Sequence, residues 1–359
     1  MISNLVVDVV DRVGSSAANG AGLTEVDAKE TARDIRTLTF RNLAQEARID
    51  SSDPRSAIWG QLAETLRDLE RPAAVVVDPR TAFVTDVLVP EVGRIVALTE
   101  SFDGAIGVHL DSSPAPLELP GDMPDARLTA IRLREAFAKG AEVVITTDRL
   151  DDLIRDVREL NRPINRGHRL SYFSTEDDVI DSVSIVSAPE AQGLFDEFVG
   201  QNCGFPVSAT CLPFRYTKGY CFAFANFIVE ALAAKGYTAG KAWLYGALQF
   251  KTENRRRCRQ KWDYHVAAFL RLTNSFDRRE LLVIDPIVRP DGPQPVKIWR
   301  ATLNQPDLAA VITDSSVYRQ SVPGHGVSEF GGETELNLQL ARSELGALSK
   351  HDSPPYSWC

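Results

Sequence analysis

The sequence predicts an α+β protein in which one buried helix packs on an antiparallel sheet. Residues 222–234 contain only two polar side chains, as in a helix buried on most sides, and Gly236 follows as a C-terminal cap. Residues 262–272 alternate between two faces at period two, which is typical of a β-strand. Residues 280–286 form a second short apolar run that ends at a proline. A polar loop joins these two runs, so together they predict a β-hairpin.

The overall composition limits the classes of function. The chain has 359 residues, which suggests two or three domains, and its hydrophobic content of 44% is ample for packed cores. A net charge of −9 argues against nucleic-acid binding, because contact with phosphates requires a basic face. No apolar run reaches the length of a membrane span, so no membrane partner is expected. Residues 1–14 lack the pattern of a signal peptide, so we expect a cytoplasmic protein or one exported without such a signal.

Residues 1–70 are predicted to be an N-terminal helical region. Apolar side chains recur at intervals of three and four residues after Thr24, and a second stripe of this kind follows Ser56. The first stripe consists of Val26, Ala32, Ile35 and Leu38, and the second of Leu62, Leu66 and Leu69.

Residues 71–185 are predicted to form a small α/β domain that ends in a linker. Residues 128–141 have the pattern of a helix, and four apolar runs have the character of strands. These runs are residues 73–78, 93–100, 104–110 and 142–148. Residues 171–184 are polar and acidic, which predicts an exposed linker.

Residues 186–359 carry the predicted hairpin and the candidate chemistry. Pro189 lies near the first turn of a helix, and the core side of that helix is formed by Leu194, Phe195 and Phe198. The antiparallel sheet of this region is predicted to contain residues 242–249, 264–272 and 281–285.

Cys221 stands at the start of the apolar helix. A thiol beside unpaired helix N–H groups and the positive end of the helix dipole is biased toward thiolate, the form that attacks carbonyl carbons. A lone cysteine on an apolar helix is more often a packing residue, so this position alone does not establish a nucleophile.

Two further side chains strengthen the case for a nucleophile. His265 lies near the start of the first hairpin strand and Asp285 at the end of the second, so antiparallel pairing would set them side by side. A cysteine nucleophile, a histidine base and a carboxylate that fixes the imidazole tautomer are what nucleophilic acyl transfer requires. Their order, with the helix before the strands, is that of papain-like and transglutaminase-like enzymes.

Several short motifs make this resemblance closer. In chain order they are QNCG (201–204), TCLPFRY (210–216), KGY (235–237), WLYGAL (243–248), Trp262 with YHVA (264–267), VIDP (283–286), Trp299-Arg300 and VYRQS (317–321). With these motifs the chain resembles the bacterial protein-glutaminase family, whose members deamidate glutamine side chains within proteins. The resemblance covers roughly residues 186–359 and implies a papain/transglutaminase-like catalytic domain.

The resemblance also implies a mechanism and a partner. Cys221 would attack the γ-carboxamide of a glutamine in a protein substrate, His265 would transfer protons, and Asp285 would orient the imidazole. Trp262 and Tyr264 would wall the substrate pocket, although packing in the core explains these aromatic side chains equally well. No cofactor and no metal are expected, because no paired ligand spacing is present.

Further expectations concern the remaining cysteines and the N-terminal half. Cys203 and Cys211 resemble a family pair that is expected to form a disulfide, and the odd total of five cysteines leaves one thiol free. Secreted protein-glutaminases carry a pro-region over the active-site cleft, and residues 72–170 occupy the corresponding place. We therefore expect intramolecular inhibition that proteolysis between Ser171 and Ser187 would relieve. A targeting or substrate-recruiting module is the competing interpretation of this half.

Three other functions remain open at this point. A transglutaminase would share the three residues but transfer the acyl group to an amine, and a papain-like peptidase would cut the main chain. A non-catalytic binding or immunity module would keep only the fold, and the intact Cys221, His265 and Asp285 argue against it. A role in nutrient processing and a role as a bacterial effector delivered to another cell are both compatible with the sequence.

Overall fold

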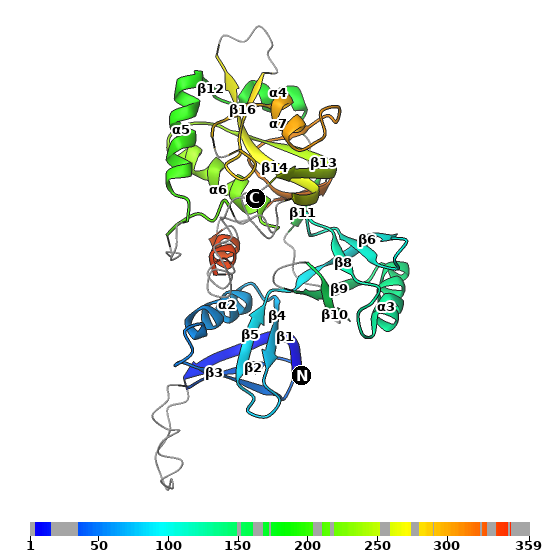
Figure 1. Cartoon of the computed structure of the whole chain (residues 1–359). Helices are drawn as coiled ribbons and strands as arrows, with labels where there is room; N and C mark the ends of the chain where they lie inside the picture. Colours follow the sequence, from blue (N-terminus) through cyan, green and yellow to red (C-terminus); the bar gives the residue numbers. More distant parts are fainter. Residues whose placement is uncertain are drawn as a thin grey trace.

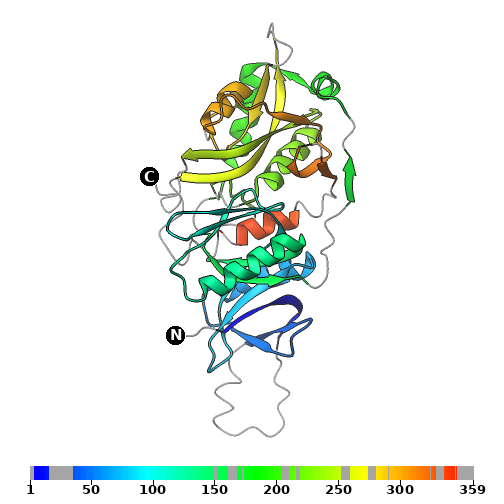
Figure 2. The same ribbon diagram turned by 90° about the vertical axis from the view of Figure 1, so that its right-hand side faces the viewer.

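The computed structural model consists of three blocks of secondary structure (Figures 1 and 2). In Figure 1 the C-terminal block lies at the top, and two smaller sheets lie below it. The structure describes residues 4–15, 35–148, 152–160, 168–171, 174–203, 210–215, 219–251, 259–273, 280–289, 291–323, 325–328, 335–343 and 345. Within these ranges, no helix is long and apolar enough to cross a membrane.

The N-terminal block is a five-stranded antiparallel sheet with one helix packed on it. The strand order is β3-β2-β1-β4-β5, and β1 at the centre pairs with β2 and β4. Helix α2 (Ser56–Asp68) buries Trp59, Leu62 and Leu66 against this sheet. The strands are β1 (Asn4–Ser15), β2 (Ile35–Phe40), β3 (Glu46–Asp50), β4 (Pro72–Val77) and β5 (Val84–Leu88).

The prediction of a helical region over residues 1–70 is wrong for most of the described part. Ile35 and Leu38 belong to β2, in which Leu38 and Phe40 are buried. The run from Ile35 to Phe40 also alternates at period two and contains β-branched residues, which favour a pleated sheet. Only the stripe after Ser56 forms a helix, whereas residues 24–34 lie outside the described ranges. Since β4 and β5 complete the same sheet, the sheet continues past the predicted boundary at residue 70.

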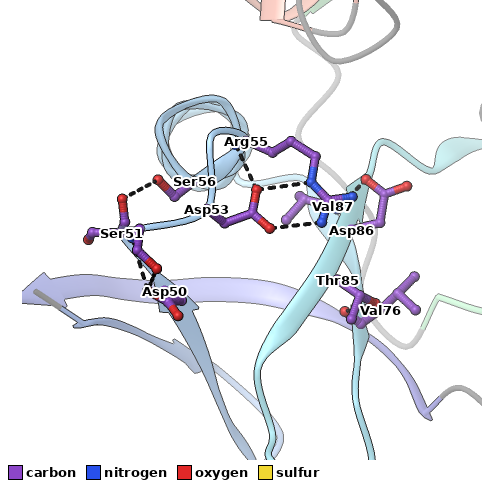
Figure 3. Close-up of polar contacts among 10 residues, drawn as sticks. Asp50, Ser51, Asp53, Arg55, Ser56, Val76, Thr85, Asp86 and Val87 are labelled. Atoms are coloured by element: carbon purple, nitrogen blue, oxygen red, sulfur yellow. Dashed lines mark hydrogen bonds and ion pairs between the residues drawn. The ribbon is translucent and has the colours of Figure 1, made fainter. Parts of the chain in front are cut away.

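Helix α2 begins beside a compact charged group (Figure 3). The Arg55 guanidinium donates two hydrogen bonds to Asp53, with Nε–Oδ1 at 3.0 Å and Nη2–Oδ2 at 2.8 Å. The same guanidinium lies 4.5 Å from the centre of the Trp59 ring, and Asp86 of β5 lies close to it in Figure 3. Arg55 therefore links the start of α2 to the sheet below it.

The second block is another antiparallel sheet covered by one helix. The order is β10-β9-β6-β7-β8, and α3 (Ala126–Lys139) packs Leu133 and Ala136 onto it. The predicted helix over residues 128–141 is confirmed, and so are the strands predicted at residues 93–100, 104–110 and 142–148. The strand predicted at residues 73–78 is also present, but it belongs to the N-terminal sheet. The strands are β6 (Glu91–Glu100), β7 (Ile106–Leu110), β8 (Leu117–Leu119), β9 (Glu142–Thr147) and β10 (Ile154–Glu159).

The C-terminal block carries a larger sheet of order β16-β15-β14-β13-β17, in which the short β12 pairs parallel to β14. Helices α5 (Ala188–Gly200) and α6 (Cys221–Ala234) supply Phe195, Phe198 and Phe224 to the core. The predicted apolar helix and hairpin are both confirmed. The strands are β12 (Ile185–Val186), β13 (Gly240–Lys251), β14 (Arg259–Leu272), β15 (Leu281–Ile284), β16 (Gln294–Pro295) and β17 (Val311–Thr313).

The segment before this block is more ordered than an exposed linker. Residues Glu176–Ser182 form helix α4, which Thr175 and Asp178 close with a capping box. Val179 and Ile180 of α4 are buried in the C-terminal core, so the linker prediction for residues 171–184 is wrong over this helix. A small sheet of order β11-β19-β18 lies nearby, with β11 (His168–Ser171), β18 (Val317–Val322) and β19 (His325–Ser328).

A buried lysine ties α6 to two strands. Lys241 of β13 is fully buried, and its Nζ donates to Asn226 Oδ1 of α6 and to the Val317 carbonyl oxygen of β18, both at 2.6 Å. Burial lowers the pKa of Lys241 to about 7, and the carboxylates of Glu230 and Asp314 oppose this change only in part. The Lys241 amine therefore holds α6 as a hydrogen-bond donor, and it loses its charge at a lower pH than an exposed lysine does.

This burial predicts a pH dependence of stability. Between about pH 7 and pH 10 the unfolded chain binds a proton at Lys241 that the folded chain does not, so the free energy of unfolding rises with pH in this window. The contribution is at most about 1.4 kcal/mol per pH unit. Urea unfolding at several pH values should show a smaller slope for Lys241→Met than for the wild type, with Lys235→Met as an exposed control. Equal slopes of the free energy of unfolding against pH in Lys241→Met and the wild type would contradict the lowered pKa of Lys241.

Candidate active site

Cys221 is the first residue of α6, and the fold buries it. Its residue exposure is 2%, and Tyr220 at the helix N-cap makes no side-chain capping hydrogen bond. Helix α6 packs on β14, and the backbone N–H groups of Phe222 and Val266 are directed at the Cys221 sulfur. A small cavity of about 10 Å³ lies between α6, β14 and β15, and its lining includes Cys221, Val266 and Asp285.

The predicted bias of this thiol toward thiolate is wrong for the form described here. Burial raises the pKa of Cys221 to about 12, and the nearby Asp285 carboxylate raises it further. The N–H groups of Val266 and Phe222 lower the pKa, but by less than burial raises it. The helix terminus is present as predicted, yet the thiol is neutral as long as water is kept away from it.

His265 and Asp285 meet as the hairpin prediction requires. Strand β14 pairs antiparallel with β15, and Ala268 lies opposite Ile284, so Asp285 comes directly after β15 beside the middle of β14. The Nε2 atom of His265 lies 2.8 Å from Asp285 Oδ2, and the two residues are 0% and 4% exposed. Among the described residues, His265 Nδ1 is buried without a hydrogen-bond partner. The ring therefore uses one nitrogen for the carboxylate and has the other available.

Asp285 also accepts hydrogen bonds from three groups besides His265. The Trp299 indole Nε1 donates to Oδ2 at 2.7 Å, and the backbone N–H groups of Ile287 and Val288 donate to Oδ1 at 3.2 and 3.4 Å. The sequence marks Trp299 only as part of the Trp299-Arg300 motif. That motif gives the residue no chemical role, so its contact with Asp285 is not predicted.

The aromatic side chains Trp262 and Tyr264 both lie in the core next to this group. The Trp262 ring stacks on His265 with centroids 4.4 Å apart, and its other face meets Phe250 at 4.6 Å. Each residue is 2% exposed, which agrees with the packing interpretation. Within the described ranges, the Trp262 Nε1 and Tyr264 hydroxyl groups are buried without hydrogen-bond partners, so both donors are left available. Their role in substrate binding stays a prediction.

The N-terminal half covers this group of residues. Residues 111–116, between β7 and β8, lie along β14, and the Pro114 carbonyl oxygen accepts the Asp263 backbone N–H at 2.5 Å. Ala115 is 4% exposed and belongs to a large hydrophobic cluster that joins residues of the N-terminal sheet and the C-terminal block, and not to the cluster of its own sheet. A Cβ atom placed on Gly219, two residues before Cys221, would lie 4.0 Å from the Pro114 ring. This segment, called the covering segment below, therefore lies against β14 and beside the turn before Cys221.

A charged contact reinforces the covering segment. His109 of β7 donates from Nδ1 to Asp263 Oδ2 of β14 at 2.6 Å, and the two side chains are 23% and 32% exposed. The Asp263 carboxylate raises the pKa of His109 above its ordinary value. The pair lines a groove between the second block and the C-terminal sheet. Other charged residues along this groove are Glu100, Asp103, Glu118, Asp152, Arg259 and Lys261.

The expected disulfide is present, because Cys203 and Cys211 are bonded to each other. This leaves Cys221 as the free cysteine of the described ranges. The same ranges contain no group of three or more His, Cys, Asp or Glu side chains arranged to hold a metal ion.

Comparison with known proteins adds a family to this geometry. A family model described as "Glutaminase" matches residues 191–303, which include Cys221, His265 and Asp285. None of the curated proteins compared with the chain matches it.

Among solved structures, pro-protein-glutaminase is similar to the chain with 21% identity and a TM-score of 0.54, over 76% of this chain and 99% of that one. A mutant of pro-protein-glutaminase has 22% identity and a TM-score of 0.52, over 71% of this chain and 92% of that one. A protein-glutaminase from Chryseobacterium proteolyticum has 25% identity and a TM-score of 0.37, over 44% of this chain and 86% of that one.

The match to pro-protein-glutaminase extends well beyond the C-terminal block, because it covers 76% of the chain. The likeness in fold thus includes part of the N-terminal half. The predicted resemblance is confirmed: residues 191–303 match the glutaminase family model, on a fold similar to that of pro-protein-glutaminase.

Proposed function

We propose that the chain hydrolyses glutamine side chains of proteins to glutamate and ammonia through a thioester at Cys221. The observation that carries this proposal is the buried pair of His265 and Asp285, in which Nε2 is held at 2.8 Å and Nδ1 has no partner within the described ranges. The cavity that Cys221 and Asp285 share lies beside this pair, in the part of the chain that matches the glutaminase model. The family supports glutamine as the substrate side chain.

The proposed reaction has two halves. In the first, Cys221 gives its proton to His265, and its sulfur bonds to the glutamine Cδ; the backbone N–H groups at the start of α6 stabilise the resulting oxyanion. The C–N bond then breaks, and His265 returns the proton to the departing nitrogen as ammonia leaves. In the second half, His265 takes a proton from water, the hydroxyl attacks the thioester, and the C–S bond breaks. His265 returns the proton to the sulfur, which restores the Cys221 thiol, and glutamate leaves.

Trp262 and Tyr264 are proposed to line the substrate pocket. Both carry buried polar atoms that have no partner within the described ranges, and a substrate amide offers hydrogen-bonding groups to such atoms. Ammonia release from a casein-like protein, compared with release from free glutamine, tests the proposed function. Release from the protein alone is the expected result.

Substitution of the site residues gives the first test of this mechanism. Cys221→Ala should abolish ammonia release, because no thioester forms. Asp285→Asn should leave a residual rate after a loss of up to about 10⁴-fold, because the carboxylate orients the imidazole and does not react. Asp291→Asn, which removes a surface ion pair with Arg289 close to the site in sequence, serves as the control and should retain activity. Undiminished turnover in Cys221→Ala would eliminate the covalent mechanism.

The N-terminal half is proposed to inhibit this activity within the same chain. The covering segment hydrogen-bonds to β14 through Pro114, and Ala115 next to it is buried, so the segment lies where an extended substrate is proposed to enter. Covering by a tethered segment benefits from a high effective concentration. Burial raises the pKa of Cys221 to about 12, so the buried thiol is a poor nucleophile. Since part of residues 171–187 is packed in α4, release requires more than a cut in a loose linker.

The His109–Asp263 contact predicts how this inhibition responds to pH. The pKa of His109 is raised by Asp263, so the charged contact is complete below the ordinary value of about 6.5 and is lost as pH rises through the raised value. Both side chains are partly exposed, which limits the contact to about 1 kcal/mol, or roughly fivefold. His109→Gln should therefore speed alkylation of Cys221 by up to roughly fivefold at pH 6.

The readout is the alkylation rate of Cys221 in the full chain, followed by peptide mass mapping. The ratio of His109→Gln to wild type should fall toward one at pH 9, because the wild type has lost the charged contact there. Arg134→Gln breaks an ion pair with Glu100 inside the second block and is the matched control. A ratio that does not change with pH would contradict the proposed contribution of the His109–Asp263 contact to the inhibition.

A further inference from the structure

The indole of Trp299 makes a contact that the reaction proposed above does not yet use. Its Nε1 lies 2.7 Å from Asp285 Oδ2, the same oxygen that His265 Nε2 approaches to 2.8 Å. We propose that Trp299 is a positioning residue: by fixing the Asp285 carboxylate, it sets the direction of the His265 ring toward Cys221. This inference rests on the proposed function for its role in turnover, whereas the geometry of the pair stands without it.

Trp299 reaches Asp285 because a short antiparallel strand and then a helix follow β15. After Asp285 the chain turns, and β16 pairs antiparallel with β15, with Leu282 opposite Pro295. Helix α7 (Val296–Thr302) starts directly after β16, and Trp299 in its middle is the residue of this helix that is buried. At 1% exposure, the indole N–H needs an acceptor inside the protein, and the Asp285 carboxylate is that acceptor.

Without Trp299 the carboxylate would be held less firmly. Its Oδ1 atom accepts the backbone N–H groups of Ile287 and Val288 at 3.2 and 3.4 Å, which are long hydrogen bonds. The two short contacts, from His265 and Trp299, are both made to Oδ2. Among the described residues, removal of Trp299 would leave the hydrogen bond from His265 as the only short contact of the Asp285 carboxylate. His265 itself gains and loses protons in the proposed reaction. The plane of the carboxylate would then follow the imidazole instead of fixing it.

Trp299 also encloses the imidazole. Trp262 stacks on His265 with the ring centroids 4.4 Å apart, and Trp299 approaches at 5.8 Å. His265 is 0% exposed, so the hydrogen bond to Asp285 lies in a region of low dielectric where it is strengthened. A donor on the carboxylate withdraws negative charge from it. Loss of the Trp299 donor should thus make Asp285 a stronger acceptor for the His265 hydrogen bond.

The chain offers a matched control in Trp243. This tryptophan is also fully buried, and its Nε1 donates to the Thr313 hydroxyl at 2.9 Å, away from Asp285. Trp299→Phe and Trp243→Phe each remove one buried indole hydrogen bond from the same block. A loss of packing alone would affect both variants in the same way, whereas a positioning role would affect only the first.

The direct test follows the histidines of the full chain by NMR after labelling their ring carbons. Five histidines give at most five Cε1 signals, and His265→Gln identifies the one of interest. In Trp299→Phe the His265 signal should change in position and width relative to the wild type, because the ring is no longer held in one orientation, and in Trp243→Phe it should not move. Trp299→His, which keeps a ring N–H, should restore the wild-type behaviour in part. A His265 signal that behaves identically in wild type and Trp299→Phe would overturn the proposal.

Turnover provides an independent readout. Trp299→Phe should lower the rate of ammonia release by about 10- to 100-fold, as expected for one hydrogen bond to a charged group. If Trp299 acts through Asp285, the same change should have little effect on an Asp285→Asn background. An equal loss on both backgrounds would assign Trp299 a general structural role and contradict the proposal. Absence of ammonia release from the wild type, both intact and after limited proteolysis between Ser171 and Ser187, would refute the proposed function, while the NMR comparison would still decide the role of Trp299.

Discussion

The site depends on one buried hydrogen bond, that between His265 and Asp285. At 0% and 4% exposure, both side chains are removed from water, and loss of a hydrogen-bond partner from a buried carboxylate is destabilising. The antiparallel pairing of β14 and β15 sets the two residues together, and α6 packs on β14 and brings Cys221 to a cavity that Asp285 also lines. The sheet and the apolar helix therefore serve mainly to hold three polar side chains in a dry environment.

Dryness has opposite consequences for the members of this group. The His265–Asp285 contact gains strength when water is excluded, whereas the Cys221 thiol loses the solvation that its thiolate needs, which raises its pKa to about 12. The covering segment lies against β14 through Pro114, and we propose that it contributes to this exclusion. In our account, one structural feature both blocks the path of a substrate and keeps the nucleophile protonated. Uncovering would reverse both effects while leaving the His265–Asp285 pair in place.

The sequence predicted the C-terminal helix and strands better than the N-terminal architecture. The helix after Cys221 and the strands around His265 and Asp285 have long, strongly apolar patterns. The helix and strands that these patterns predict are the ones found in the structure. Residues Ile35–Phe40 satisfied both a helical and an alternating pattern, and pairing with β1 and β3 decided for the strand. Helix α4 was missed because its acidic first turn resembles a linker, although the capping box of Thr175 and Asp178 was visible in the sequence. Long-range contacts such as Trp299 with Asp285 have no local signal, and neither has the loss of solvent around Cys221.

The central claim is that Cys221 forms an acyl-enzyme that water resolves. The most direct measurement is mass spectrometry of a glutamine-containing protein after incubation with the chain and an excess of a primary amine. Our account predicts a gain of about one dalton at each modified glutamine, which corresponds to glutamate, with little amine attached and an unbroken main chain. Predominant attachment of the amine would indicate a transglutaminase, and cleaved fragments would indicate a peptidase; either result would contradict the account.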